Sequence, residues 1–108
     1  MIIKIIQILT IIIWWKKLIN KNRLVNVYEL RGNSKICMGN YWDSISDFSK
    51  AIKIDHNDFF LYFWRGFAYE SLEEYPNAVK DLKIAKHLDP SFTLTTSILD
   101  HIKSKGFQ

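Results

Sequence analysis

The sequence has few of the residues that indicate a secreted, fibrous or disordered protein. Its single cysteine, Cys37, excludes an intramolecular disulfide framework and a zinc site made only of thiolates. Two prolines and four glycines among 108 residues exclude collagen and low-complexity polymers. Because 48% of the residues are hydrophobic, the chain has the composition of one small globular domain. The scarcity of cysteine is typical of a protein that lies in, or faces, the cytosol.

Acidic residues are missing from the start of the chain, and the positive charge is confined there. Residues 1–24 contain five basic side chains and no acidic one, whereas residues 25–108 contain ten basic and eleven acidic side chains. The formal net charge of +4 therefore belongs to the N-terminal segment. An RNA-binding helical repeat, which is an alternative function for this chain, would need clustered Lys and Arg along its surface, so the charge makes nucleic acid an unfavoured partner.

Residues 1–24 form an apolar segment with the residue order of a membrane boundary. Ile and Leu dominate residues 2–19. Two tryptophans followed by two lysines at residues 14–17 are the residue types that favour the lipid headgroup layer. The stretch without a charged residue, 5–15, is too short to span a bilayer unless Lys4 and the lysine pair lie at opposite interfaces. We expect a membrane anchor with the rest of the chain facing the cytoplasm, or an apolar helix that packs on the domain of a cytoplasmic protein. A cleaved signal peptide is disfavoured because no small-residue cleavage site follows.

The rest of the sequence contains an internal repeat of 34 residues. Aligning residues 25–58 with residues 59–92 gives seven identities, where unrelated segments would give about two, and a fixed period of this length is typical of a helical repeat array. The identical pairs are Tyr28/Tyr62, Arg31/Arg65, Gly32/Gly66, Tyr41/Tyr75, Asp47/Asp81, Ala51/Ala85 and Asp55/Asp89.

Each repeat predicts two helices joined by a short turn. In the second repeat, Asn57 or Asp58 can cap a helix that runs to about residue 72. The next helix starts at Tyr75, because proline fits the first turn that follows, and ends at Asp89-Pro90.

The first repeat predicts the same layout. Residues 24–38 and 41–54 form its two helices, and Gly39 permits a left-handed turn between them. After the second repeat, Ser91 can cap a last helix within residues 93–108. The apolar residues of this capping helix follow one side: Phe92, Leu94, Ile98, Leu99 and Ile102.

Two glycines lie in the middle of predicted helices, where glycine costs roughly 1 kcal/mol relative to alanine. They are Gly32 and Gly66. We expect each to lie where two helix backbones come close together, because a side chain at that position would keep the helices apart.

These residues resemble the tetratricopeptide repeat family. The second repeat carries its aromatic, small and large positions as Tyr62, Gly66, Tyr69, Ala78, Leu82 and Ala85, with Pro90 closing the unit, and the first repeat matches at Tyr28, Gly32, Phe48 and Ala51. The resemblance implies an all-α superhelix of two helix hairpins, and we expect a C-terminal capping helix after it and an apolar N-terminal helix before it. Departures from the pattern are Arg31 and Arg65 in place of leucine, Lys35 in place of an aromatic residue, Ser44 in place of a small residue and His56 in place of proline.

No arrangement of residues indicates catalysis. The three histidines, His56, His87 and His101, are dispersed, and none forms a zinc-hydrolase pair with a glutamate. Cys37 lacks the neighbours of a nucleophile and is predicted to be a small packed residue. We therefore predict that the protein is not an enzyme and needs no cofactor or metal.

In an array of this family, one face of each first helix looks into a concave groove. The residues on that face are Asn26, Glu29, Asn33, Ile36, Phe60, Phe63, Phe67 and Glu70. We predict that this groove binds a segment of a protein partner, with an apolar side chain against Phe63 and Phe67 and basic residues near the glutamates. The aromatic residues could instead pack inside the domain, and a purely structural, self-associating role is a further alternative.

One mode of binding known in the family is not predicted for this chain. Its chaperone-binding members use lysine, arginine and asparagine to hold a carboxyl terminus. Asn33 could be one such residue, but Glu29 stands where a lysine would be needed and Phe63 where a second polar group would be needed.

Overall fold

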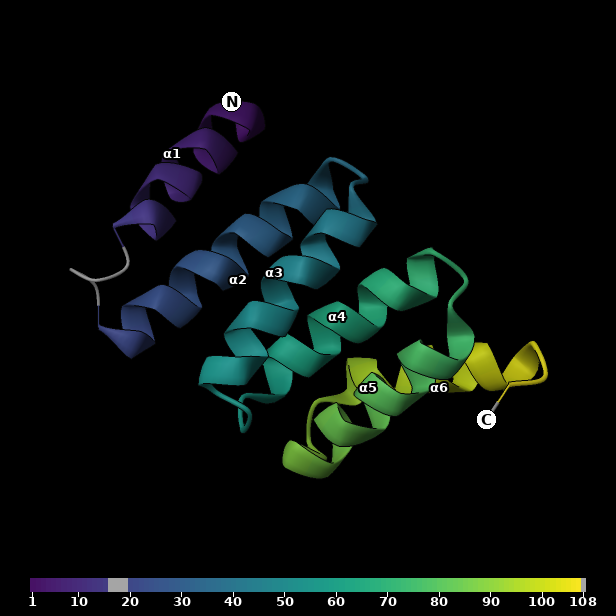
Figure 1. The fold of residues 1–108 in the computed structure, drawn as a ribbon. Coiled ribbons are helices and arrows are strands. Elements are labelled where there is room, and N and C mark those ends of the chain that lie inside the picture. Colours follow the sequence, from purple (N-terminus) through teal and green to yellow (C-terminus); the bar gives the residue numbers. More distant parts are fainter. Residues whose placement is uncertain (16–19, 108) are drawn as a thin grey trace. The chain divides into compact units, whose positions relative to one another are not determined.

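The computed structural model describes residues 1–15 and 20–107, and the regular secondary structure in these ranges is entirely helical (Figure 1). The helices are α1 (Ile2–Trp14), α2 (Lys21–Cys37), α3 (Tyr41–Ile54), α4 (Phe59–Ser71), α5 (Tyr75–Leu88) and α6 (Thr93–Ser104). The predicted all-α fold is confirmed. Two parts of the predictions lie outside the described residues: Lys16 and Lys17, which were expected at the lipid headgroups, and Gln108, the last residue of the capping segment.

Local capping chemistry explains where the helices begin. Asp58 caps α4, as predicted, because its carboxylate accepts a hydrogen bond from the Phe60 N–H at 3.0 Å. Helix α2 begins at Lys21, earlier than predicted, because the Asn20 side chain accepts from the Arg23 N–H at 3.0 Å.

The start of α6 differs from the prediction. Phe92, and not Ser91, is the residue at its N-cap, and no side chain caps the helix. Ser91 instead donates from its N–H and its hydroxyl to Asp89 Oδ1, at 3.1 and 2.5 Å, in a local turn. The predicted apolar stripe is also partly wrong, since Leu94 is 51% exposed and Thr95 takes the buried position.

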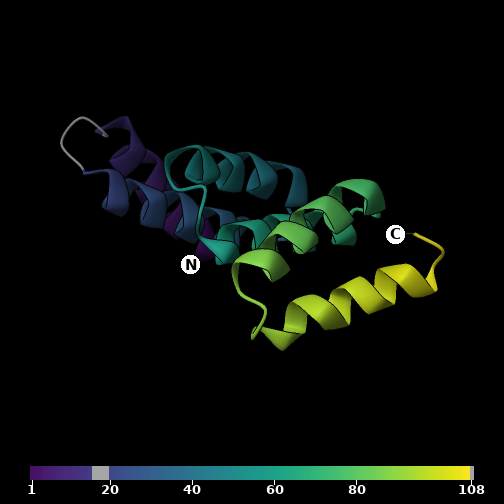
Figure 2. The same ribbon diagram turned by 90° about the horizontal axis from the view of Figure 1, so that it is seen from below.

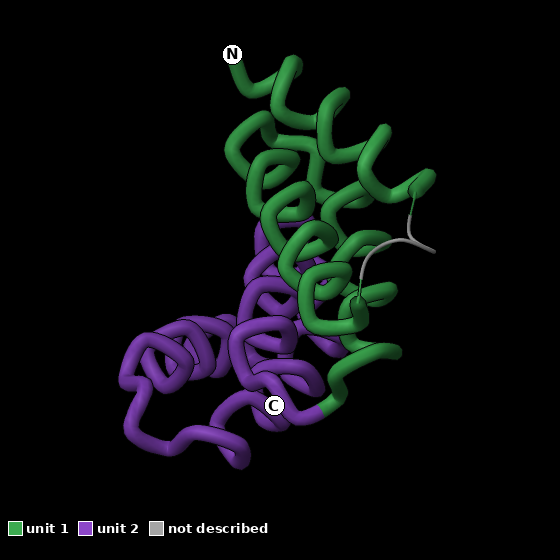
Figure 3. Tube along the Cα trace, turned by 90° about the vertical axis from the view of Figure 1, so that its left-hand side faces the viewer, with its two compact units in different colours: residues 1–56 green, residues 57–108 purple. Residues whose placement is uncertain are grey.

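The chain divides into two compact units, residues 1–56 and residues 57–108 (Figure 3). In the first unit, α2 and α3 form a hairpin and α1 packs on α2. In the second unit, α4 and α5 form a hairpin, and α6 packs on α5 with a smaller contact to α4 (Figure 2).

The mid-helix glycines lie where the two helices of each hairpin touch. A Cβ atom added to Gly32 would lie 2.8 Å from Cζ of the buried Phe48 ring on α3. A Cβ atom added to Gly66 would lie 2.8 Å from Cγ of Leu82 and 3.4 Å from the Ala78 carbonyl oxygen on α5. A side chain at either position would overlap these atoms. The predicted approach of a neighbouring backbone is seen at Gly66, whereas the atoms nearest to Gly32 belong to the Phe48 ring.

The turn from α2 to α3 is closed by a left-handed residue. Gly39 has φ 75° and donates its N–H to the Ile36 carbonyl oxygen at 2.9 Å, while the Asn40 N–H reaches back to the Lys35 oxygen at 2.8 Å. This pair of bonds is the Schellman motif, which favours glycine because its left-handed residue has no Cβ to clash.

The equivalent turn of the second repeat uses glutamate in the same conformation. Glu73, which lies 34 residues after Gly39, has φ 59°. It donates to the Glu70 carbonyl oxygen at 2.9 Å, and the Glu74 N–H donates to the Tyr69 oxygen at 2.9 Å. A residue with a side chain is strained in this region by roughly 1–2 kcal/mol, so the second repeat keeps the turn at a cost that the first avoids.

We expect Gly32→Ala and Gly66→Ala to lower the free energy of unfolding by about 1–2 kcal/mol each. Overpacking of the helix contact, which costs about 1–3 kcal/mol, outweighs the gain of about 1 kcal/mol in helix propensity. Urea denaturation followed by circular dichroism measures the change. Ser46→Ala, on the exposed side of α3, is the control and should be neutral or slightly stabilising. A Gly66→Ala variant at least as stable as the parent would refute the close approach.

We expect Glu73→Gly to raise the free energy of unfolding by about 0.5–1 kcal/mol, because glycine relieves the left-handed strain and loses part of this gain to its larger unfolded-state entropy. Thermal and urea unfolding of the full chain measure it. Glu73→Gln removes the charge but keeps the strain, so it should not stabilise the protein. Equal stabilisation by Gly and Gln would show that charge, and not backbone conformation, is responsible.

Candidate functional site

A buried ion pair joins α2 to α3 in the first unit. Asp47 has no exposed surface and receives hydrogen bonds from Arg31 Nε, at 3.0 and 2.9 Å to its two oxygens, and from the second Arg31 terminal nitrogen. Lys35 Nζ lies 3.1 Å from the same carboxylate. Such a fork of parallel hydrogen bonds fixes direction as well as charge, so it sets the rotation of α2 against α3.

The second unit repeats this pair between α4 and α5. Arg65 Nε donates to Asp81 Oδ2 at 2.7 Å and Arg65 Nη2 to Oδ1 at 2.8 Å. Burial alone would lower the pKa of the Arg65 guanidinium, but the hydrogen bonds to Asp81 and the charge of that carboxylate outweigh burial, so the pKa is raised above its ordinary value. Arg65 therefore stays charged throughout the physiological pH range.

The two ion pairs explain a departure from the family pattern. Arginine replaces leucine at positions 31 and 65, and in both repeats an aspartate sixteen residues later receives it. Each guanidinium also lies about 6 Å from a tyrosine ring, at 6.0 Å from Tyr28 for Arg31 and 5.9 Å from Tyr62 for Arg65. The sequence signal for this contact is that both the arginine and the aspartate are identical in the two repeats, and the prediction did not pair them.

On α4, the aromatic residues form one cluster with Phe92 at the start of α6. The ring of Phe63 lies 5.1 Å from that of Phe92 and 5.2 Å from that of Trp64, and Phe60 lies 5.3 Å from Phe92. The edge-to-face orientations are those that aromatic rings prefer. Sequence reasoning missed Phe92 as a member of this cluster, because it assigned the residue to the stripe of the last helix.

The cluster decides which predicted α4 residues a ligand can reach. Phe63 is 1% exposed, so its ring belongs to the interior of the second unit. Phe60 is 38% exposed, and Phe67 and Glu70 are half-buried. The accessible part of the predicted α4 face therefore consists of Phe60, Phe67 and Glu70.

On α2, the predicted residues follow one side of the helix. Asn26 is exposed, and Glu29, Asn33 and Ile36 are half-buried. Their spacing of three and four residues places them on successive turns of one face. The Asn33 side-chain oxygen is out of contact with water and accepts no hydrogen bond from any residue that the structure describes. The α2 and α4 faces lie in different units, and their joint role in binding stays a prediction.

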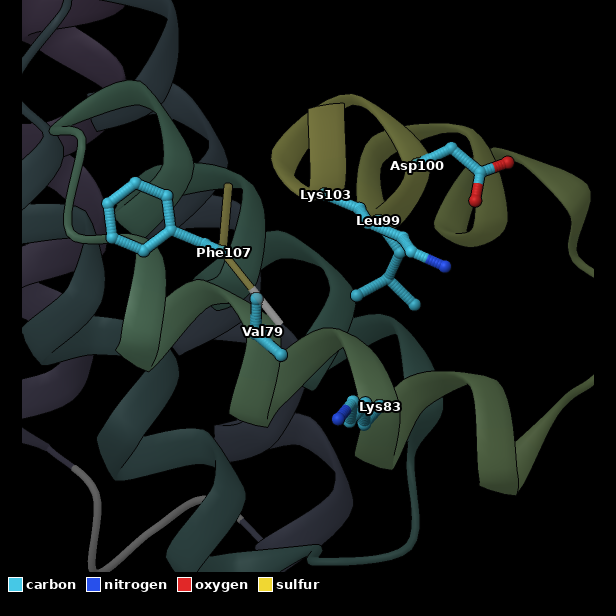
Figure 4. Close-up of a pocket in the computed structure, with 6 residues that line it drawn as sticks. All are labelled: Val79, Lys83, Leu99, Asp100, Lys103 and Phe107. Carbon is cyan, nitrogen blue, oxygen red and sulfur yellow. The ribbon is translucent and has the colours of Figure 1, made fainter. Parts of the chain in front are cut away.

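A pocket of about 210 Å³ lies between α5 and α6 in the second unit (Figure 4). Its wall combines apolar and charged side chains: Val79, Lys83, Leu99, Asp100, Lys103 and Phe107. The Phe107 ring also packs against Tyr75, with ring centres 4.8 Å apart. Helical spacing could not indicate this pocket, because Phe107 follows the turn that ends α6.

The residues considered for chemistry are dispersed over the surface. His56, His87 and His101 are exposed. Cys37 is exposed, so the prediction that it is packed is wrong. It is the last residue of α2 and lies beyond Ser34, the last buried residue of that helix. Within residues 1–15 and 20–107, no three His, Cys, Asp or Glu side chains gather as ligands of a metal ion.

Helix α1 packs on α2 by one side. Leu9 is buried, and Thr10 Oγ1 accepts a hydrogen bond from Arg31 Nη1 at 3.1 Å. None of the helices in the described part of the chain has both the length and the apolar content that crossing a bilayer requires.

Hairpins of two helices repeated at a fixed period, with a further helix packed on the second, define a helical-repeat protein. The chain is 34% identical over 64 residues to small glutamine-rich tetratricopeptide repeat-containing protein 2 of Saccharomyces cerevisiae, a match that covers 59% of this chain and 18% of that protein. The sequence matches none of the known protein-family models. The chain spans less than a fifth of the length of the curated relative that it matches.

Two solved structures share the fold with a TM-score of 0.73 each, and each match covers 75% of this chain. One is the first TPR of Spaghetti (RPAP3) bound to the HSP90 peptide SRMEEVD, at 21% identity over 64% of that chain. The other is the TPR domain of Arabidopsis OM64, at 25% identity over 67% of that chain. With the 34-residue repeat, these similarities show that the chain has the fold of a tetratricopeptide repeat protein.

We expect Asp81→Asn to lower the free energy of unfolding by about 3 kcal/mol, because Arg65 would keep a largely buried charge without its counter-ion. Replacing both residues by leucine should cost less than Arg65→Leu alone, since the single change leaves the Asp81 carboxylate buried and unpaired. Urea denaturation measures all three variants. Asp100→Asn, at an exposed position on α6, is the control and should change stability by less than about 0.5 kcal/mol. An Asp81→Asn variant as stable as this control would contradict the role of the pair.

Proposed function

We propose that the protein is a protein–protein interaction module that holds a short segment of a partner and catalyses no reaction. The observation that carries the proposal is the aromatic face of α4, where Phe60 is 38% exposed and Phe67 is partly exposed on a helix of a tetratricopeptide fold. Exposed aromatic side chains on a rigid helix are common anchors for a partner, because they bury much area with little loss of entropy.

The face of α2 that occupies the equivalent positions in the first repeat supports this proposal. Asn26, Glu29, Asn33 and Ile36 lie 34 residues before Phe60, Phe63, Phe67 and Glu70, respectively. The first repeat thus offers mainly polar groups where the second offers aromatic ones. A partner segment that contacts both faces would need an apolar residue for α4 and hydrogen-bonding groups for α2.

The negative charges on the α2 and α4 faces indicate which residues a partner segment should carry. Glu70 adds a negative charge beside Phe67 on the half-buried face of α4. The peptide in the RPAP3 structure, SRMEEVD, is acidic at its end. Because Glu29 stands where a cation would be needed to hold such an end, we propose that this chain prefers an apolar residue flanked by lysine or arginine.

Selection from a random heptapeptide library displayed on phage, with the full chain immobilised, tests the proposal. We expect enriched sequences to combine an apolar residue with basic neighbours. In fluorescence anisotropy with a synthetic enriched peptide, Phe67→Ala should weaken binding at least about tenfold, as for an aromatic anchor. Glu70→Lys should weaken it several-fold, with the largest effect at low salt.

Trp42→Ala is the matched control, because Trp42 is an aromatic residue that is 57% exposed on α3. It should leave the affinity unchanged. The peptide SRMEEVD should bind at least tenfold more weakly than the enriched peptide. Enriched peptides whose binding survives both α4 variants would overturn the assignment to α4, and tight binding of SRMEEVD would overturn the charge preference.

A further inference from the structure

Helix α1 carries large apolar residues on both of its sides, and α2 covers only one of them; Lys4 and Gln7 are exposed on the uncovered side. Leu9 is 6% exposed, and the half-buried residues share its side: Ile5, Ile6, Thr10, Ile12 and Ile13. The bond from Arg31 to Thr10 fixes the rotation of α1 about its own axis, because Thr10 must face α2 to receive it. The other side of α1 is therefore presented away from α2.

Large apolar side chains occupy this outer side. Their exposed fractions are 60% for Ile3, 57% for Ile8, 60% for Ile11, 83% for Trp14 and 62% for Trp15. Ile8, Ile11 and Trp15 follow each other at spacings of three and four residues, so they form a continuous stripe along the helix. An apolar stripe of this size needs a covering partner.

The charge around the stripe indicates what that partner is. The first unit, residues 1–56, contains nine basic and four acidic residues, a net charge of +5, whereas the second unit has six basic and seven acidic residues. Lys4 lies on α1 itself, and Lys21 and Arg23 are exposed at the start of α2. A second copy of the chain docked face to face would bring two positively charged segments together, which disfavours self-association at this side.

We propose that α1 lies flat on a bilayer that contains anionic lipid. The isoleucine stripe and the two indoles enter the boundary between headgroups and acyl chains, and the flanking cations bind lipid phosphates and carboxylates. With one side held along α2, the helix presents its other side lengthwise, so its axis of about 20 Å runs parallel to the surface. This function is independent of the peptide binding proposed for α4.

Flotation of the full chain with lipid vesicles tests this mode of binding. Vesicles of phosphatidylcholine with phosphatidylserine should carry the protein, and vesicles of phosphatidylcholine alone should carry it at least tenfold less. High salt should release it, because the attraction to anionic lipid is screened. On binding, tryptophan emission should shift to shorter wavelength as Trp14 and Trp15 leave water.

The double variant Ile8→Gln, Ile11→Gln should reduce vesicle binding at least tenfold. Leu94→Gln is the matched control, since Leu94 is an apolar residue that is 51% exposed on α6, and should bind as the parent does. Phe67→Ala should also leave vesicle binding unchanged, so failure here and failure of the peptide-binding proposal are separate results.

Four outcomes would overturn the proposal. Equal binding to both kinds of vesicle, or binding that resists high salt and alkaline carbonate, would show that anionic lipid does not hold a surface helix. No vesicle binding, together with a dimer in light scattering that the glutamine variant dissociates, would assign the stripe to a second copy. No vesicle binding by a monomeric chain would leave the stripe without a lipid partner and equally refute the proposal.

Discussion

Each hairpin depends on one crossing point, where an ion pair lies beside a glycine against which a large side chain packs tightly. Arg31 and Gly32 are adjacent in α2, and their partners Asp47 and Phe48 are adjacent in α3. The second repeat places the same two contacts between α4 and α5. The missing side chain sets the distance between the helices, and the forked hydrogen bonds set their rotation. Together these contacts determine which residues of α2 and α4 point away from the hairpin.

Most of this fold could be predicted from sequence, because its signals are local or periodic. The repeat, the left-handed Gly39 and the capping Asp58 each act within a few residues or at a fixed offset. The rest depends on contacts between distant residues. From the sequence, Arg31 was only a departure from the family pattern, and its partner Asp47 lies on another helix. Ser91 does not cap α6 because its hydroxyl donates to Asp89, a local contact that a capping rule does not consider.

The candidate binding face on α4 was likewise predictable from periodic spacing but not from contacts between distant residues. Helical spacing places Phe60, Phe63 and Phe67 on one side of α4, but spacing does not reveal that Phe92 packs against Phe60 and Phe63. The sequence contained the signal that a helix with so many aromatic residues needs cover on more than one side. The covering residue comes from the beginning of another helix, where no amphipathic period applies. Interior packing therefore buries Phe63 and leaves Phe67 as the anchor that we propose for a partner.

The buried ion pair of the first unit also reaches the N-terminal helix. Asp47 holds Arg31, and Arg31 in turn donates to Thr10 on α1. Thr10 also donates to the Ile6 carbonyl oxygen at 2.8 Å, which fixes its hydroxyl for accepting from Arg31. A leucine at position 31, as the family pattern has it, could pack against α3 but could make no such bond. The arginine that replaces it thus both closes the hairpin and orients α1, so the direction in which the isoleucine stripe faces is set by a charge buried in the first repeat.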